Sequence, residues 1–197
     1  EVIYHGTYGA NGEVDLTASV STPRTDDHSK VFLRLRYDFR STLPAKDAWF
    51  FRLGRGHVFA PKISLGNREG LIKEFEAPTG LKVGELLADR FAFTGAAPWW
   101  LGFPGSKVGN TPSGSRGLVI RSFRANFSSK SYDTPLISLP VGAVAGFVRT
   151  DQGYEKKTDS ADSLRHVDAA IVPPSEIETF QPGDSVEMEI EIDVVPV

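Results

Sequence analysis

The sequence predicts an all-β protein, a single β-sandwich over residues 1–197 that is jelly-roll-like and carries one short capping helix. Several segments alternate strictly between apolar and polar residues, which is the pattern of strands with one buried face. The 19 glycines and 13 prolines suit tight turns between many strands. A length of 197 residues suits one domain with a sizeable core.

The N-terminal part begins with a predicted hairpin and continues into a basic strand. Residues 1–8 and 13–20 are expected to form strands, joined by a turn at residues 9–12 because Asn-Gly supplies a positive φ there. In the next strand, residues 31–39, apolar side chains alternate with polar ones. Its polar face carries an arginine ladder that extends just past the strand: Arg34, Arg36 and Arg40.

Two segments in the middle of the chain predict contrasting structures. Residues 47–54 are nearly all apolar, which predicts a central strand covered on both faces, where Arg52 would need a buried partner. Residues 81–90 supply the one predicted helix. It is short, is interrupted by Gly84, and is expected to cap an open end of the sheets.

Residues 98–127 form the predicted functional centre. An aromatic cluster with Trp99 and Trp100 precedes a loop of small residues, 106–115, and a strand at 116–127. Residues 91–132 contain five basic side chains and no acidic one. Indole rings beside guanidinium groups suit an anionic sugar, whose apolar ring face stacks while arginine holds its carboxylate or sulfate. Neighbours in an extended segment point to opposite sides, so we expect one buried tryptophan and one exposed, the latter Trp100. In the alternative interpretation, both plug one end of the sandwich.

The last predicted strand, residues 184–195, carries a ladder of acidic side chains on its polar face: Glu187, Glu189, Glu191 and Asp193. Because this ladder is opposite in sign to the arginine ladder, the two strands are predicted to lie in one sheet, adjacent or one strand apart. The net charge of −3 hides a basic zone of net +7 over residues 30–73 and an acidic zone of net −9 over residues 151–197. Such zones indicate an anionic partner or two halves that pair with each other.

Several classes of site and location are disfavoured. The chain has no cysteine, and its four histidines lack metal-ligand spacing, so we predict no cofactor and no metal site. Residues 151–155 and 159–162 come nearest to a calcium loop without a clear motif. The longest apolar run, 135–148, is too short for a membrane span, and no nucleic-acid module is recognisable. The start at Glu1 and the lone Met188 are typical of a mature secreted protein or an excised module.

The sequence partly fits two classes of enzyme. Glu191-Ile-Asp193-Val-Val195-Pro196 resembles the E-x-D-x-x-E signature of laminarinase-like β-jelly-roll glycosidases, but Pro196 stands where that family has its acid/base glutamate. A lyase acting on uronates needs a Tyr or His base with Arg or Asn to neutralise the carboxylate. Candidates for those roles are His57, Asn67, Arg52, Arg121 and Tyr132, but the R-x-E-x-R, Q-I-H and Y-F-K-x-G-x-Y signatures of jelly-roll alginate lyases do not occur.

Four tracts resemble the non-catalytic β-sandwich modules of bacterial multi-domain polysaccharide-degrading enzymes. They are Trp49-Phe-Phe-Arg-Leu-Gly54, Ile63-Ser-Leu-Gly-Asn-Arg-Glu-Gly-Leu71, Ser115-Arg-Gly-Leu-Val-Ile-Arg-Ser-Phe123 and Gly183-Asp-Ser-Val-Glu-Met-Glu-Ile190. The resemblance implies a secreted carbohydrate-binding module within a larger protein, often with a structural Ca²⁺. We therefore predict binding of an anionic polysaccharide, with a lyase or a structural sandwich without a ligand as alternatives. The predicted ligand-binding residues are Trp99, Trp100, Arg116, Arg121, Arg124, Arg52, His57, Asn67 and Arg68.

Overall fold

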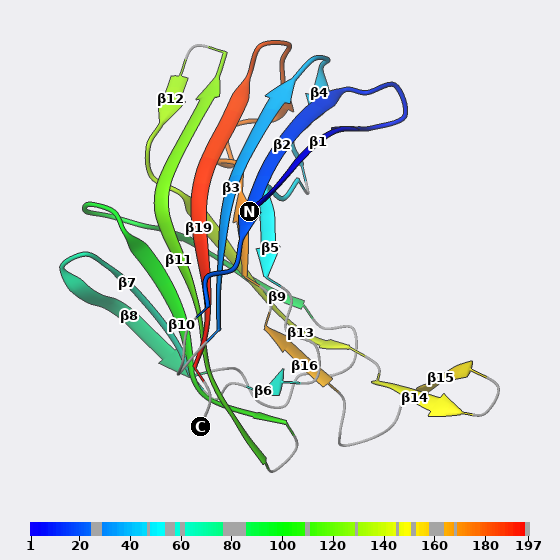
Figure 1. Ribbon diagram of the computed structural model, residues 1–197, viewed down its shortest axis with the longest axis vertical. Coiled ribbons are helices and arrows are strands. Elements are labelled where there is room, and N and C mark those ends of the chain that lie inside the picture. The colour runs from blue at the N-terminus through cyan, green and yellow to red at the C-terminus, as the bar shows by residue number, and fades with distance from the viewer. Residues whose placement is uncertain are drawn as a thin grey trace.

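The computed structural model describes residues 1–24, 29–46, 48–53, 58–59, 62–76, 86–108, 111–128, 130–144, 146–150, 153–157, 164–167 and 169–195 (Figure 1). These residues form antiparallel strands and their connections, and no helix occurs among them. The all-β prediction is confirmed. In this part of the chain no helix is long and apolar enough to cross a membrane.

The larger of two main sheets has ten strands, and its N-terminal hairpin lies at one end of it (Figure 1). Its strands run in the order β1 (Val2–Tyr8), β2 (Val14–Ser21), β3 (Ser29–Phe39), β19 (Ser185–Val195), β11 (Thr111–Phe127), β10 (Trp99–Val108), β7 (Lys62–Asn67) and β8 (Gly70–Glu76), with β12 (Lys130–Tyr132) beside β11 and β6 (Val58–Phe59) beside β10. The predicted turn at residues 9–12 is present, with positive φ at Gly9 and Gly12.

The smaller main sheet has five strands. It consists of β16 (Leu164–Val167), β13 (Leu136–Val144), β17 (Ala169–Val172) and β5 (Phe51–Leu53), with β9 (Leu86–Ala92) also paired to β13. Two separate pairs complete the described strands, β14 (Gly146–Thr150) with β15 (Gly153–Lys157), and β18 (Thr179–Phe180) with β4 (Leu43–Pro44).

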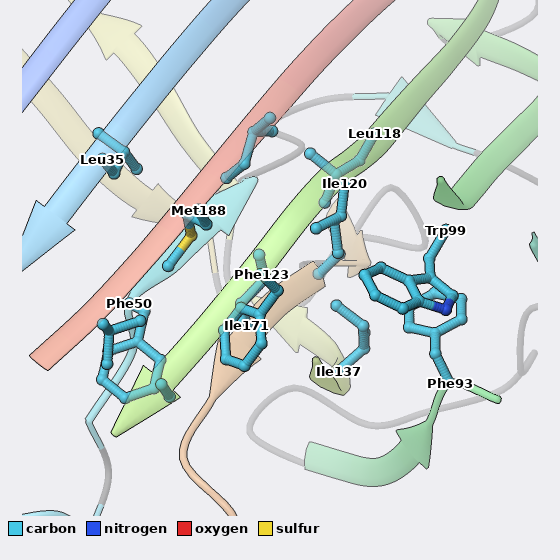
Figure 2. Packing of buried hydrophobic residues seen from close by; sticks show 14 of the residues in the cluster. Leu35, Phe50, Phe93, Trp99, Leu118, Ile120, Phe123, Ile137, Ile171 and Met188 are labelled. Carbon is cyan, nitrogen blue, oxygen red and sulfur yellow. The ribbon is translucent and has the colours of Figure 1, made fainter. Parts of the chain in front are cut away.

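One hydrophobic core joins the two main sheets (Figure 2). The larger sheet contributes the apolar residues of its alternating strands, among them Leu35, Ile63, Leu101, Leu118 and Met188. The smaller sheet contributes Ile137, Leu139 and Ile171, which are almost fully buried. The sheets therefore face each other as the two layers of a sandwich.

The two charged ladders lie in adjacent strands, as predicted. In the pairing of β19 with β3, Glu189 is opposite Arg34 and Glu187 is opposite Arg36. Arg34 donates through Nε to a carboxylate oxygen of Glu189 at 2.9 Å, and Nη1 of Arg36 lies 3.8 Å from Glu187. The two ladders thus form ion pairs with each other within the sheet.

Strand β11 contains an irregularity at Arg121. Ile120 pairs with Ile190 of β19, and the next pair is Ser122 with Glu189, so Arg121 is an extra residue on its strand. Such a bulge shifts the alternation of all residues after it. On the N-terminal side of the bulge, Leu118 and Ile120 are buried; on the C-terminal side the buried residues are Phe123, Ala125 and Phe127.

Three sequence-based predictions about local structure are wrong for the described residues. Residues 86–90 of the expected helix belong to strand β9, paired with β13, while residues 81–85 lie outside the described part. Pairing with β13 outweighs the helical preference of a few leucines. The expected loop at 106–115 is narrower, because β10 continues to Val108 and β11 begins at Thr111.

The third wrong prediction is the central strand at residues 47–54, because the described residues 48–53 do not form one. Only Phe51–Leu53 is a strand, β5, and it lies at the end of the path through the smaller sheet. Trp49 is 50% exposed, and Arg52 is exposed instead of buried. The aromatic residues of this segment therefore line the margin of the core, whereas Phe50 alone is fully inside it.

Candidate functional site

The side chains of the adjacent residues Trp99 and Trp100 in strand β10 point to opposite faces of the larger sheet. Trp99 is 5% exposed and packs near Phe93, with its indole N–H donating to the carbonyl oxygen of Gly95 at 3.2 Å (Figure 2). Trp100 lies on the outer face and is partly buried. This is the division between core and surface expected of neighbours in an extended strand.

Trp100 is held in place by the neighbouring strand β7. Its indole N–H donates to the carbonyl oxygen of Asn67 at 3.1 Å, and its ring lies against the backbone of Gly66. Asn67 is itself buried, and both ends of its side-chain amide are hydrogen-bonded. The amide nitrogen donates to the carbonyl oxygen of Thr94 at 3.0 Å, and the amide oxygen accepts the N–H of Glu69. Asn67 thus fixes the turn that supports the ring.

Arg121 faces outward and binds a carboxylate of its own protein. Its Nε donates to Glu191 at 2.7 Å, and its second terminal nitrogen also contacts that carboxylate. Lys30 binds the other carboxylate oxygen of Glu191 at 2.7 Å, and the Arg121 guanidinium also lies 5.4 Å from the ring centre of Phe32. Glu191 is therefore a buried carboxylate between two cations, with its side chain only 3% exposed.

The surroundings of this carboxylate shift two acidic groups in opposite directions. Burial raises the pKa of Glu191, but hydrogen bonds from Lys30 and Arg121 lower it by more, so its pKa lies below the usual range. Burial and the charge of Glu191 raise the pKa of Asp193, two residues along the same strand. Paired carboxylates with divergent pKa values suit acid/base chemistry in general, but here Glu191 is enclosed by its two cations.

The other predicted residues are distributed over both faces of the molecule. Arg124 is exposed on the outer side of β11 opposite Glu187, and Arg68 is exposed in the turn between β7 and β8. The backbone of Arg116 lies in β11, but its side chain and all of His57 are outside the described part. Trp100, Arg121 and Arg124 share the outer face, whereas Arg52 belongs to the smaller sheet.

A second candidate site is centred on Trp49, which was not among the predicted ligand residues. The guanidinium carbon of Arg52 lies 4.3 Å from the centre of a Trp49 ring, which is cation–π distance. The exposed indole and the cation therefore occur together here. Sequence reasoning missed this because the apolar run around Trp49 reads as a buried strand.

Trp49 lines an open groove of about 500 Å³ between the inner face of the larger sheet and the segment leading into β5. The groove is walled by residues of β1, β2 and β3 on one side and by residues 43–44 and 48–50 on the other. Its lining consists of Tyr8, Val14, Leu16, Tyr37, Phe39, Leu43, Pro44, Ala48, Trp49, Phe50 and Phe180.

Among the described residues of that lining, the titratable groups are two tyrosines. Burial raises the pKa of Tyr37 to about 12, and its hydroxyl donates to the carbonyl oxygen of Phe50. Tyr37 is thus neutral at physiological pH and its proton is already engaged. The described lining residues offer apolar ring faces and no carboxylate or imidazole, and Arg52 lies against Trp49.

Within the described part of the chain, no three His, Asp, Glu or Cys side chains gather in a way that would hold a metal ion. The two weak calcium-loop segments, 151–155 and 159–162, fall on residues whose side chains lie outside that part.

Comparisons with protein-family models, with curated proteins and with solved structures find no match to this chain.

Proposed function

We propose that this chain is a non-catalytic module that binds an anionic polysaccharide in the groove beside Trp49 and Arg52. One observation carries the proposal. The half-exposed indole of Trp49 lines an open groove and carries a guanidinium group 4.3 Å from its ring centre. Stacking surface and positive charge therefore occur at one place.

The chemistry of a uronate or sulfated sugar matches that pair. The C–H face of a pyranose is apolar and packs on indole, while its equatorial groups remain available for hydrogen bonds. Arginine presents a planar fork that binds carboxylate or sulfate with two parallel bonds. An open groove, as opposed to a closed cavity, admits a polymer chain that continues beyond the site on both sides.

The lining of the groove supports binding over lyase chemistry. Proton abstraction from a uronate requires a base whose pKa lies near the working pH. Tyr37, with its pKa raised to about 12 and its hydroxyl hydrogen-bonded to Phe50, does not suit that role. Tyr8 is the other titratable residue among the described residues of the lining. Secretion and an accessory place in a larger polysaccharide-degrading protein are part of the proposal and rest on the sequence resemblance.

The test is affinity electrophoresis against a uronate polymer and a neutral β-glucan, with melting temperatures measured in parallel. Trp49→Ala should abolish retardation by the uronate polymer with little change in melting temperature, because the side chain is half exposed. Arg52→Gln should weaken uronate binding while leaving any retardation by the glucan unchanged. Trp100→Ala, on the opposite face of the larger sheet, is the control.

Three outcomes would overturn the proposal or part of it. Equal retardation of Trp49→Ala and the unchanged protein would remove the groove as the site. Loss of binding in Trp100→Ala alone would move the site to the outer face. Absorbance of unsaturated sugar on incubation with the uronate polymer would show that the protein is a lyase.

A further inference from the structure

Strand β1 ends the larger sheet, and among the described residues no strand pairs with its free side. The backbone groups on the outer side of such an edge are available for pairing with another strand. Natural proteins usually protect long edges with lysines, prolines or bulges. From Val2 to Tyr8, β1 contains no charged residue other than His5 if protonated, no proline, and an unbroken register with β2.

The opposite edge of the sheet is different. Strand β8, with the sequence GLIKEFE, carries Lys73, Glu74 and Glu76 within seven residues, and its pairing with β7 is irregular between Leu65 and Gly66. Charges and an irregular register are the devices that discourage edge pairing. The contrast singles out β1 as an edge left open in this fold.

The side chains of β1 are apolar and exposed on both faces. Val2, Ile3, Tyr4 and Tyr8 are 54–60% exposed, which makes them four of the seven large hydrophobic residues that stand exposed in the described chain. Between the two tyrosines, on the same face, Gly6 has nothing within 4 Å of the place where a Cβ would stand. On this face of β1, the rings of Tyr4 and Tyr8 therefore have an open gap at Gly6 between them.

We propose that a second copy of this chain pairs antiparallel along β1, with the two His5 residues opposite each other at the twofold axis. This register pairs all seven residues of the strand: Val2 with Tyr8, Ile3 with Thr7, and Tyr4 with Gly6 of the second copy. Each Tyr4 ring then covers the open space at the other Gly6, a cross-strand arrangement in which an aromatic ring shields a strand glycine. The two larger sheets become one continuous sheet.

Self-complementarity and area favour a second copy as the occupant. Four half-exposed apolar side chains leave roughly 450 Å² per copy, and with the edge backbone the pair would bury about 1,000 Å² in total. That lies at the lower end for specific interfaces, so the dimer should be weak, with a dissociation constant in roughly the micromolar range. No pair of like charges meets in this register unless both His5 rings are protonated.

The first test is the molar mass of the purified chain in a concentration series by analytical ultracentrifugation. The molar mass should rise from that of one chain to that of two as the concentration passes through the micromolar range. The double variant Val2→Lys, Tyr4→Lys should weaken dimerisation at least about tenfold, because it places charges on both copies of the row. Leu71→Lys, an equally exposed apolar residue on the other edge strand, should leave the dimer unchanged. Circular dichroism confirms the fold of each variant.

The second test fixes the register. The chain has no cysteine, so a single introduced thiol reports one position. In the proposed pairing the Cα atoms of residue 5 are about 4.5–5.5 Å apart, within disulfide reach, and those of residue 7 are about 14 Å apart. Under mild oxidation His5→Cys should form a covalent dimer and Thr7→Cys should not. A chain that stays monomeric at every concentration, a partner of another sequence required for assembly, or equal cross-linking at positions 5 and 7 would overturn the proposal.

Discussion

The indole of Trp100 occupies the space that a side chain at Gly66 would need. A Cβ built at Gly66 would lie 2.1 Å from Cζ2 of Trp100 and 2.5 Å from the carbonyl oxygen of Gly70. The second of these contacts is with backbone and is not easily relieved. A glycine is therefore required at position 66, since the indole ring of Trp100 from the next strand lies against its backbone.

Gly66→Ala should destabilise the protein by about 1–3 kcal/mol, the usual cost of forcing extra atoms into a packed place. Gly102→Ala is the matched control, because Gly102 is in the adjacent strand and its Cβ would stand 3.9 Å from the same ring. Urea unfolding of both variants measures the difference. Equal free energies of unfolding would show that the ring moves aside without cost.

Trp99→Ala should lower the free energy of unfolding by roughly 3–5 kcal/mol, because it empties a buried place in the core. Trp100→Ala should cost clearly less, since its ring is partly solvated already. Chemical denaturation of the two variants decides this. A larger loss at Trp100 would mean that the outer ring, with its bond to Asn67, is the stronger support.

Glu191→Gln should destabilise the protein by about 2 kcal/mol at neutral pH, because it weakens charge-assisted hydrogen bonds at a buried carboxylate. Glu189→Gln is the control two residues away, where the carboxylate is 38% exposed and pairs with a mostly solvated Arg34. Its loss should stay below about 1 kcal/mol. Similar losses in thermal or urea unfolding would contradict the distinction between the two carboxylates.

The pH dependence of stability should change in the same variant. The pKa of Glu191 is lowered in the folded state, so its stabilisation is complete above the usual glutamate pKa of about 4.3 and is lost as the pH falls. The raised pKa of Asp193 acts in the opposite sense and offsets part of that loss. Urea unfolding between about pH 6 and pH 3 should show a shallower decline for Glu191→Gln than for the unchanged protein.

Binding to a uronate polymer should weaken as salt is added. The Debye length falls from about 10 Å at 0.1 M to about 3 Å at 1 M, which screens the contact between Arg52 and an anionic group. Retention on the uronate gel should therefore decrease over this range. Retention that is independent of salt would indicate stacking on Trp49 alone.

The strands with strict alternation were predictable because each has a single buried face. The apolar sets of β3 and β19, and the charges between them, follow from a period of two, and opposite signs are enough to predict that the strands are neighbours. The division between Trp99 and Trp100 follows from the same rule. These are local or nearest-neighbour properties of a strand.

Other features depend on contacts that local pattern does not encode. The burial of Glu191 requires Lys30 and Arg121 from two flanking strands, and alternation alone places it outside with the rest of its ladder. An apolar run such as that around Trp49 reads the same whether it is covered on both faces or lies at a margin. Residues 86–90 are leucine-rich enough for a helix, and only the pairing with β13 makes them a strand. The groove is lined by residues from several segments far apart in the sequence, which no single segment reveals.

Because Arg121 is an extra residue, the parts of strand β11 before and after it alternate between core and solvent in different phases. Removing Arg121 alone would restore an uninterrupted strand and leave Phe123, Ala125 and Phe127 facing the core in their present pairing with β19. Inserting one residue before Leu118 would instead misplace the N-terminal half and leave the other in phase. A one-residue length change elsewhere in this strand should therefore be far more damaging than a deletion of Arg121, which keeps both parts of the strand in phase.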